Sequence, residues 1–440
     1  MQYEIVLLSI INNMLLHMKK IISAMLLTVV IFSNAQTENF GIIGTENWME
    51  NWTNFRPKST IFKDPNIILS GEISQNITLE KKNTYLIMGA LYLTNNAILN
   101  IEAGTVIRGD YETIGTLIIC KGSKIIANGT ATDPIIFTSI KGASERNAGD
   151  WGGIIILGGA PINKLGGFAV LDFNLDSKYA VYGGNDDQND SGILKYVRIE
   201  FSGKKMKDGK DLNGLSLAGI GANTTIDHVQ ISFSNDDSFQ FYGGNVKLSN
   251  LISFKATDDD FDFTQGVQCD IKNSIALRYP FYSDISKSRC FEIESYDKVN
   301  NTDFSKKMTL VNATNMSFVN VEENNQGLIN EAIYLKQNAL LNVTNTLISG
   351  FSSAVLFDMK PGDKIDYLKK LEFRNLLFNK CDENFMAQLK TDIPEISNYF
   401  ATTNYTIENS QKTLLELFIE TDLKKNVDFR KKSNIILTTR

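Results

Sequence analysis

The sequence predicts an all-β protein: a right-handed parallel β-helix solenoid with an N-terminal cap and a partly helical C-terminal cap. Short runs of Val, Ile, Leu and Phe alternate with Asn, Asp, Gly, Ser and Thr along most of the 440 residues. This period of two is typical of strands that are broken by turns. The runs recur at a spacing of roughly 22 residues, which suits one coil of a β-helix and is about half of a propeller blade. Helical periodicity is scarce before residue 362.

The composition is that of a folded protein whose partner is not a polyanion. Hydrophobic residues make up 43% of the chain, charged residues make up 21%, and the net charge is −6. A core of this size excludes disorder, and the acidic balance argues against binding to nucleic acid. Four cysteines are too few for a disulfide framework, although Cys269 and Cys290 are close enough in the sequence for one local bridge.

Residues 1–35 are predicted to be an export signal. Lysines follow Met18, residues 21–32 are mostly apolar, and residues 33–35 form a small-residue cleavage site before Gln36. Met18 can then serve as the true start of translation. The pattern predicts a protein that is exported to the medium or to the outer cell surface, with no membrane span once the signal has been removed.

Three further segments complete the predicted organisation. Residues 36–83 are expected to cap the N-terminal end of the solenoid, and residues 84–361 are expected to form the β-helix. Residues 362–440 are expected to form a C-terminal cap or a small appended unit. Within this last part, residues 363–378 and 411–425 contain clustered Leu, Lys and Glu that are compatible with amphipathic helices.

An internal repeat is clearest in two neighbouring coils. Residues 226–231 align with residues 248–253, and residues 236–241 align with residues 258–263. Equivalent positions of successive coils lie over one another in a parallel solenoid. We therefore expect two pairs of phenylalanine rings to stack between the coils, Phe239 with Phe261 and Phe241 with Phe263.

Three segments carry a specific resemblance to known proteins. They are residues 100–107 (NIEAGTVI), residues 127–139 (ANGTATDPIIFTS) and residues 149–153 (GDWGG). At these positions the sequence resembles secreted right-handed β-helix proteins of the Bacteroidetes, which share the pectate-lyase-like fold. The resemblance extends from about residue 45 to residue 360. It implies the fold and export rather than one reaction, because many members of the family have no established activity.

Paired aspartates in the repeated coils are the strongest candidates for a functional site. If the phenylalanines point inward, strand alternation places the aspartates outward, on coils about 4.8 Å apart. Like charges at this distance favour raised pKa values or a bound cation, and a hard cation such as Ca²⁺ accepts carboxylate oxygens. The predicted metal ligands are Asp236, Asp258, Asp260 and Asp262. Aspartates that cap turns, or a carboxylate pair that hydrolyses a glycosidic bond, are the alternatives.

Four aromatic side chains are candidates for contact with a glycan, because sugar rings stack on exposed aromatic faces. They are Trp151, Tyr242, Tyr279 and Tyr282. Packing in the core or in a cap is the alternative for each of them, since the open end of a solenoid has to be covered by apolar side chains.

Two functions are compatible with the sequence. The first is a secreted or surface protein that binds a polysaccharide, a matrix or a cell-surface glycan without catalysis. The second is a Ca²⁺-dependent polysaccharide lyase or a carboxylate-pair glycoside hydrolase. His228 is the only histidine after the predicted signal, and no Gly-His-Gly string occurs. Arg278 is expected to pair with an acidic neighbour rather than to act as a base. The sequence favours binding and leaves catalysis open.

Overall fold

A computed structural model describes residues 14, 17–20, 40–206, 209–284, 287–324, 326–336, 339–359, 364–402 and 405–432. The chain divides into two units, Met1–Asn39 and Phe40–Arg440. The predicted export signal lies in the first unit and, apart from the five residues named, outside the described part of the chain. No helix among the described residues is long and apolar enough to cross a membrane.

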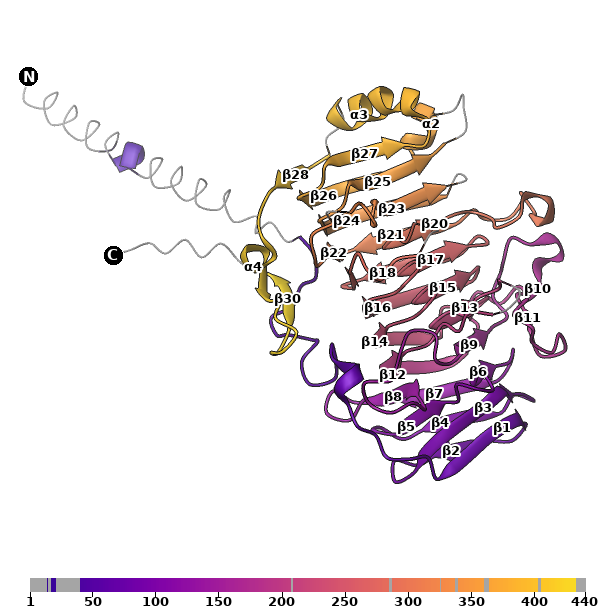
Figure 1. Cartoon of the computed structure of the whole chain (residues 1–440). Helices are drawn as coiled ribbons and strands as arrows, with labels where there is room; N and C mark the ends of the chain where they lie inside the picture. The colour runs from indigo at the N-terminus through magenta and orange to yellow at the C-terminus, as the bar shows by residue number, and fades with distance from the viewer. Residues whose placement is uncertain are drawn as a thin grey trace, which may run out of the picture. The chain divides into compact units, whose positions relative to one another are not determined.

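The described residues of the second unit form a parallel β-helix, which confirms the predicted fold class (Figure 1). Among these residues, 26 strands belong to one continuous sheet that winds around three faces. The first face contains β6 (Thr116–Ile119), β9 (Gly153–Leu157), β13 (Leu215–Ala218), β15 (Phe239–Tyr242), β17 (Phe261–Thr264), β20 (Phe291–Ile293), β23 (Glu331–Lys336), β25 (Ser353–Asp358) and β27 (Glu383–Ala387).

The other two faces share several long strands. The second face contains β2 (Ile77–Leu79), β4 (Ile98–Ile101), β7 (Lys124–Asn128), β18 (Gln268–Lys272) and β21 (Leu310–Thr314). The third contains β5 (Val106–Gly109), β8 (Ile135–Ser139), β19 (Ile275–Arg278), β22 (Ser317–Asn320) and β28 (Ile407–Ser410). Strands that run from the second face into the third are β12 (Gly192–Glu200), β14 (Thr225–Ser232), β16 (Asn245–Phe254), β24 (Leu340–Ser349) and β26 (Glu372–Asn379). At the start of the solenoid, β1 (Ile67–Ile73) and β3 (Thr84–Leu93) run from the third face into the first.

The remaining elements lie outside this winding sheet. Two short antiparallel pairs are β10 (Ala169–Val170) with β11 (Val181–Tyr182), and β29 (Phe418–Glu420) with β30 (Asp428–Lys431). The helices are α2 (Lys364–Leu368), α3 (Ile393–Thr402) and α4 (Leu414–Leu417), and the 3-10 turns are η1 (Pro57–Ser59), η2 (Leu165–Gly167), η3 (Val299–Asn301) and η4 (Lys390–Asp392).

The predicted register of the repeated coils is confirmed. β15 and β17 pair in parallel, and Phe239 is opposite Phe261. The ring centroids of this pair are 4.9 Å apart, and those of Phe241 and Phe263 are 4.7 Å apart. The stacked rings fill the interior, where buried Leu, Ile, Val and Phe side chains form one long core.

The corner between the second and third faces uses a left-handed residue in coil after coil. Asn250 has φ 55° and Asn273 has φ 52°. Asparagine tolerates this region because its short amide can form local hydrogen bonds. The amide of Asn273 donates to Oδ1 of Asn250 over 2.7 Å. The corner is therefore held by a hydrogen bond that follows the solenoid axis.

Coil length varies more than the predicted 22 residues. Ser249 bonds to Asp227 in the preceding coil, 22 residues away, whereas Asn312 bonds to Asp270, 42 residues away. The extra residues form loops outside the sheet, and these loops obscure the repeat after β17. Cys269 and Cys290 are both buried and free, so the bridge considered above is not formed.

The solenoid is also longer than predicted. Parallel pairing begins at Ile67 rather than at residue 84, and it ends at Ser410 rather than at residue 361. The segment predicted as a helix over residues 363–378 is helical only in α2 and then forms β26. The alternation in β26 is decisive, because its side chains complete a coil of the core.

The N-terminal segment does not cap the first coil, although the sequence predicted that it would. It runs along the outside of the third face, where Phe55 contacts the ring of Phe254 at a centroid distance of 5.2 Å. Trp52 is buried in the same layer, and β29 and β30 complete it with Phe418 and Phe429. The apolar side chains that point outward from the third face explain this position, since they need a cover.

Candidate functional site

Two carboxylate triads lie at the turns that lead from the third face to the first and on the first-face strands that follow them. In the first triad, carboxylate oxygens of Asp236, Asp237 and Asp258 lie within 4.8 Å of one another. The second triad consists of Asp259, Asp262 and Glu292, whose carboxylate oxygens also lie within 4.8 Å of one another. The segments before β15 and β17 supply most of these residues, and parallel pairing places the two segments in adjacent coils.

The first triad is dominated by like charges. Burial raises the pKa of Asp236 well above its ordinary value, and the neighbouring Asp258 raises it further. Burial, followed by Asp236 and Asp258, does the same for the pKa of Asp237. Oδ1 of Asp237 accepts the backbone N–H of Asp259 over 2.9 Å. The main influences on these two carboxyls are therefore burial and other carboxyls.

The second triad has its own positive partners. Nη1 of Arg289 lies 2.7 Å from Glu292, and Lys336 forms an ion pair with the same carboxylate. Burial and Glu292 raise the pKa of both Asp259 and Asp262, while Arg289 opposes the shift at Asp259 and Lys336 opposes it at Asp262. Oδ1 of Asp262 is buried without a hydrogen-bond partner among the described residues.

Asp260 does not belong to either triad, so the prediction that four aspartates share one outward surface is wrong at this position. Its side chain is 0% exposed and forms an ion pair of 2.9 Å with Nη1 of Arg278. Asp260 precedes β17, in the turn where strand alternation no longer applies. The expected pairing of Arg278 with an acidic neighbour is confirmed, and Arg278 also donates to the carbonyls of Asp258 and Arg289.

The four aromatic candidates have different surroundings. Trp151 is 0% exposed and its indole N–H donates to the carbonyl of Glu200, so the prediction that it stacks on a glycan is wrong. Tyr279 is buried against Phe254, and Tyr242 packs against Tyr182. The fourth candidate, Tyr282, is half-buried, and its ring contacts the ring of Phe233.

The loop of residues 279–284 lies beside the first triad. Tyr282 is half-buried, and the adjacent Phe281 is 70% exposed. The backbone N–H of Asp284 donates to the carbonyl of Thr257 over 3.0 Å, and Asp284 contributes to the raised pKa of Asp236. The loop therefore approaches the first triad through Asp284, while the ring of Tyr282 contacts Phe233 and Lys255.

Some members of the site could not be found from the spacing of the repeat. Asp237 and Asp259 belong to the repeated aspartate runs, but they precede β15 and β17. Alternation within a strand therefore does not predict which way their side chains point. Glu292 lies opposite Asp262 in the register of β17 and β20. Because 30 residues separate these two positions, a repeat of 22 residues does not align them. The inserted loop between β17 and β20 therefore conceals, at the level of sequence, that Asp262 and Glu292 are neighbours.

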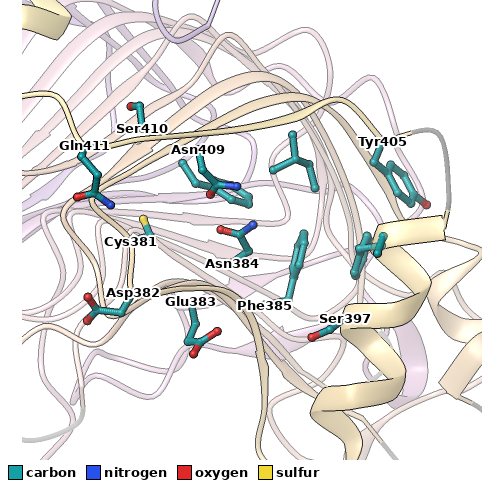
Figure 2. A pocket seen from close by; sticks show the side chains of 14 residues that line it. Cys381, Asp382, Glu383, Asn384, Phe385, Ser397, Tyr405, Asn409, Ser410 and Gln411 are labelled. Carbon is teal, nitrogen blue, oxygen red and sulfur yellow. The ribbon is translucent and has the colours of Figure 1, made fainter.

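A cavity near the C-terminal end of the solenoid shares no lining residue with the triads. Its volume is about 650 Å³, and it lies between β27, α3 and β28 (Figure 2). Phe385 and Phe400 stack with a centroid distance of 4.0 Å at one side, and Cys381 lines another part. Burial raises the pKa of the Cys381 thiol to about 11, so this cysteine is mainly a protonated thiol at neutral pH.

Comparisons with known proteins give one match. A family model described as a pectate-lyase-like β-helix domain matches residues 71–416. The comparisons with curated proteins and with solved structures found no similar protein.

Proposed function

We propose that this chain, which belongs to the pectate-lyase-like β-helix family, is an exported protein that binds a glycan beside a Ca²⁺ site and does not cleave it. The observation that carries the proposal is the first triad with its adjacent aromatic loop. Three carboxylates within 4.8 Å supply charge for a cation, and exposed Phe281 with Tyr282 supplies a surface for a sugar ring.

The donor set of the first triad fits Ca²⁺. Calcium accepts six to eight oxygen ligands, mostly from carboxylates, carbonyls and water. Asp236, Asp237 and Asp258 offer only oxygen, and their mutual repulsion in a buried position is relieved by a divalent cation. A bound Ca²⁺ would supply a fixed positive charge for hydroxyl or carboxylate oxygens of the glycan.

Binding is favoured over cleavage by the ion pairs of the second triad. A carboxylate that acts as a nucleophile or base has to be available to the substrate. Glu292 is instead held by Arg289 and Lys336. These contacts give Glu292 of β20 a structural role, because they tie it to the segment before its own strand and to the end of β23.

Glycoside hydrolysis is the second candidate function, and one observation supports it. Burial and Glu292 keep the pKa of Asp262 well above its ordinary value, as a general acid requires. The oxygens of Asp262 and Glu292 lie within 4.8 Å, slightly below the separation of about 5–5.5 Å between the carboxyls of retaining enzymes.

Retention by polysaccharide in a native gel tests the proposed function. We expect one or more neutral or acidic polysaccharides to retard the wild-type protein in millimolar Ca²⁺, and a chelator or Asp236→Asn to abolish the effect. Phe281→Ala with Tyr282→Ala should weaken binding about tenfold, equivalent to about 1.4 kcal/mol. Phe304→Ala removes a phenylalanine that is 54% exposed in another loop and is the matched control.

Two results would contradict this proposal. Equal retardation in Ca²⁺ and in chelator would show that glycan binding does not require a cation. Release of reducing ends from a retained polysaccharide, abolished by Asp262→Asn, would replace binding by hydrolysis.

Export is a separate part of the proposal. It rests on residues 18–35, whose positive start, apolar run and small-residue end are typical of a cleaved signal. We expect protein recovered from the medium or the cell surface to begin near Gln36. N-terminal sequencing measures this directly, and an exported chain that retains Met18 would contradict cleavage.

A further inference from the structure

In the described part of the chain, the core side chains of the first coil are only partly covered. Within the described part of the chain, β1 pairs only with β3, and β2 pairs only with β4. The inward side chains of this coil are partly exposed, and they are Ile67, Leu69, Ile73 and Ile77. Their partners one coil further along are buried, and these are Tyr85, Ile87, Leu93 and Leu99. The exposed edge therefore leaves part of the core open to water.

β1 lacks the lysine and proline residues that often protect an edge strand, although its pairing with β3 shifts register between Ser70 and Gly71. Natural sheets protect their edges with lysine, proline or a covering helix, because a free edge pairs readily with another strand. β1 has seven residues, IILSGEI, with no lysine, arginine or proline. Its only charged residue is Glu72, whose carboxylate accepts hydrogen bonds from the hydroxyls of Thr94 and Tyr179. Ile68 points outward and is 62% exposed.

The opposite end of the solenoid is covered. Ile396 and Phe400 of α3 are buried against the last coil, where Phe400 stacks on Phe385. Figure 1 shows α2 and α3 over that end and no helix beyond β1 and β2 at the other. The two ends are thus not complementary, and one copy cannot extend the sheet of another in a head-to-tail array.

The described chain that precedes β1 is already bound elsewhere. The backbone N–H of Gly41 donates to the carbonyl of Asn345, and the backbone N–H of Ile42 donates to Oγ of Ser317. These acceptors belong to β24 and β22, several coils of about 4.8 Å from β1. The segment from Phe40 onward then follows the outside of the third face. Among the described residues, this segment therefore does not cover the first coil.

We propose that the first coil is covered by the first coil of a second copy, in a two-fold symmetric dimer in which β1 pairs with β1. A two-fold contact requires a surface that is complementary to itself, and two identical strand edges meet this condition in antiparallel pairing. The nearly uncharged edge avoids like-charge repulsion between the copies. The contact buries the four partly exposed apolar side chains, and the covered opposite ends close the assembly at two copies. This proposal does not depend on the glycan or on Ca²⁺.

Sedimentation of the mature chain tests the dimer. We expect the wild type to have twice the mass of one chain and Ile68→Lys to have the mass of a single chain, because a lysine on the edge opposes strand pairing. Leu415→Lys is the matched control, since Leu415 is 61% exposed and belongs to α4. This control should remain a dimer.

Hydrogen exchange gives a second measurement that does not depend on a variant. The amides of β1 should exchange more slowly as the protein concentration rises, while the amides of α4 should not change. A wild type that stays monomeric at every concentration, larger open-ended assemblies, or equal dissociation by Leu415→Lys would each overturn the proposal. Circular dichroism verifies that Ile68→Lys retains the fold, and a variant that unfolds is replaced by Ile68→Glu, which also places a charge on the edge, in the same comparison.

Discussion

Replacing Arg278 by alanine is expected to lower the free energy of unfolding by about 3–5 kcal/mol, the usual range when one partner of a buried ion pair is removed. Arg278 and Asp260 are both 0% exposed, and the alanine variant leaves the carboxylate of Asp260 buried without its cation. The variant also removes hydrogen bonds to the carbonyls of Asp258 and Arg289, which hold the turn beside the triads. Urea unfolding measures the change.

Two controls separate this effect from the loss of any arginine. Arg374 forms an ion pair with Glu372 on the surface, and its side chain is 65% exposed. Arg374→Ala should change stability by less than about 1 kcal/mol, as exposed ion pairs do. The double variant Arg278→Met with Asp260→Asn should recover much of the loss, because neither member of the pair is then charged. Equal effects of Arg278→Ala and Arg374→Ala would contradict the buried ion pair.

In the presence of a chelator, the contribution of the triads to stability is expected to fall as the pH rises above about 4, near the ordinary pKa of an aspartate. Burial, together with neighbouring carboxyls, raises the pKa values of Asp236, Asp237, Asp259 and Asp262 in the folded state. The folded protein then binds more protons than the unfolded chain between the ordinary and the raised pKa values. Its free energy of unfolding decreases through that window, by about 1.4 kcal/mol for each pKa unit of one group.

The measurement is urea unfolding between pH 4 and pH 8, in wild type and in Asp236→Asn with Asp237→Asn. The double variant should gain stability relative to wild type as the pH rises in chelator. Millimolar Ca²⁺ should remove this difference, because cation binding stabilises only the folded wild type, by about 2.7 kcal/mol at 100 times Kd. A difference that does not change with pH, or that Ca²⁺ does not alter, would contradict the cation site.

Asp227 provides a control, because its pKa is lowered in the folded state and its contribution to stability should depend on pH in the opposite direction. Burial raises its pKa, but hydrogen bonds from His228, Ser249 and Asn250 outweigh burial and lower it to about 2. An acid with a lowered pKa stabilises the folded state above its ordinary pKa and loses this contribution as the pH falls. Asp227→Asn should therefore cost stability at neutral pH and cost less toward pH 2.

Strand alternation and the stacking of two neighbouring coils could be predicted from the sequence, because both depend on regular spacings over short stretches of chain. Phe239 and Phe241 alternate with polar residues within one strand, and their partners lie 22 residues away in a coil that has no inserted loop. The sequence therefore predicted the solenoid, the ring stacks and the aspartate-rich turns. It also predicted that Arg278 pairs with an acid, as the structure shows.

Other features depended on tertiary structure because they involve residues that are brought together by loops of unequal length. Glu292 joins Asp262 only after an inserted loop has returned the chain to the first face. Asp260 turns inward because it precedes β17 and meets Arg278, and Trp151 is buried because its indole N–H reaches Glu200. The exposed first coil likewise follows from where the N-terminal segment packs. Sequence periodicity determines which residues form strands and core, whereas the folded chain decides which charges meet and which edge of the solenoid remains uncovered.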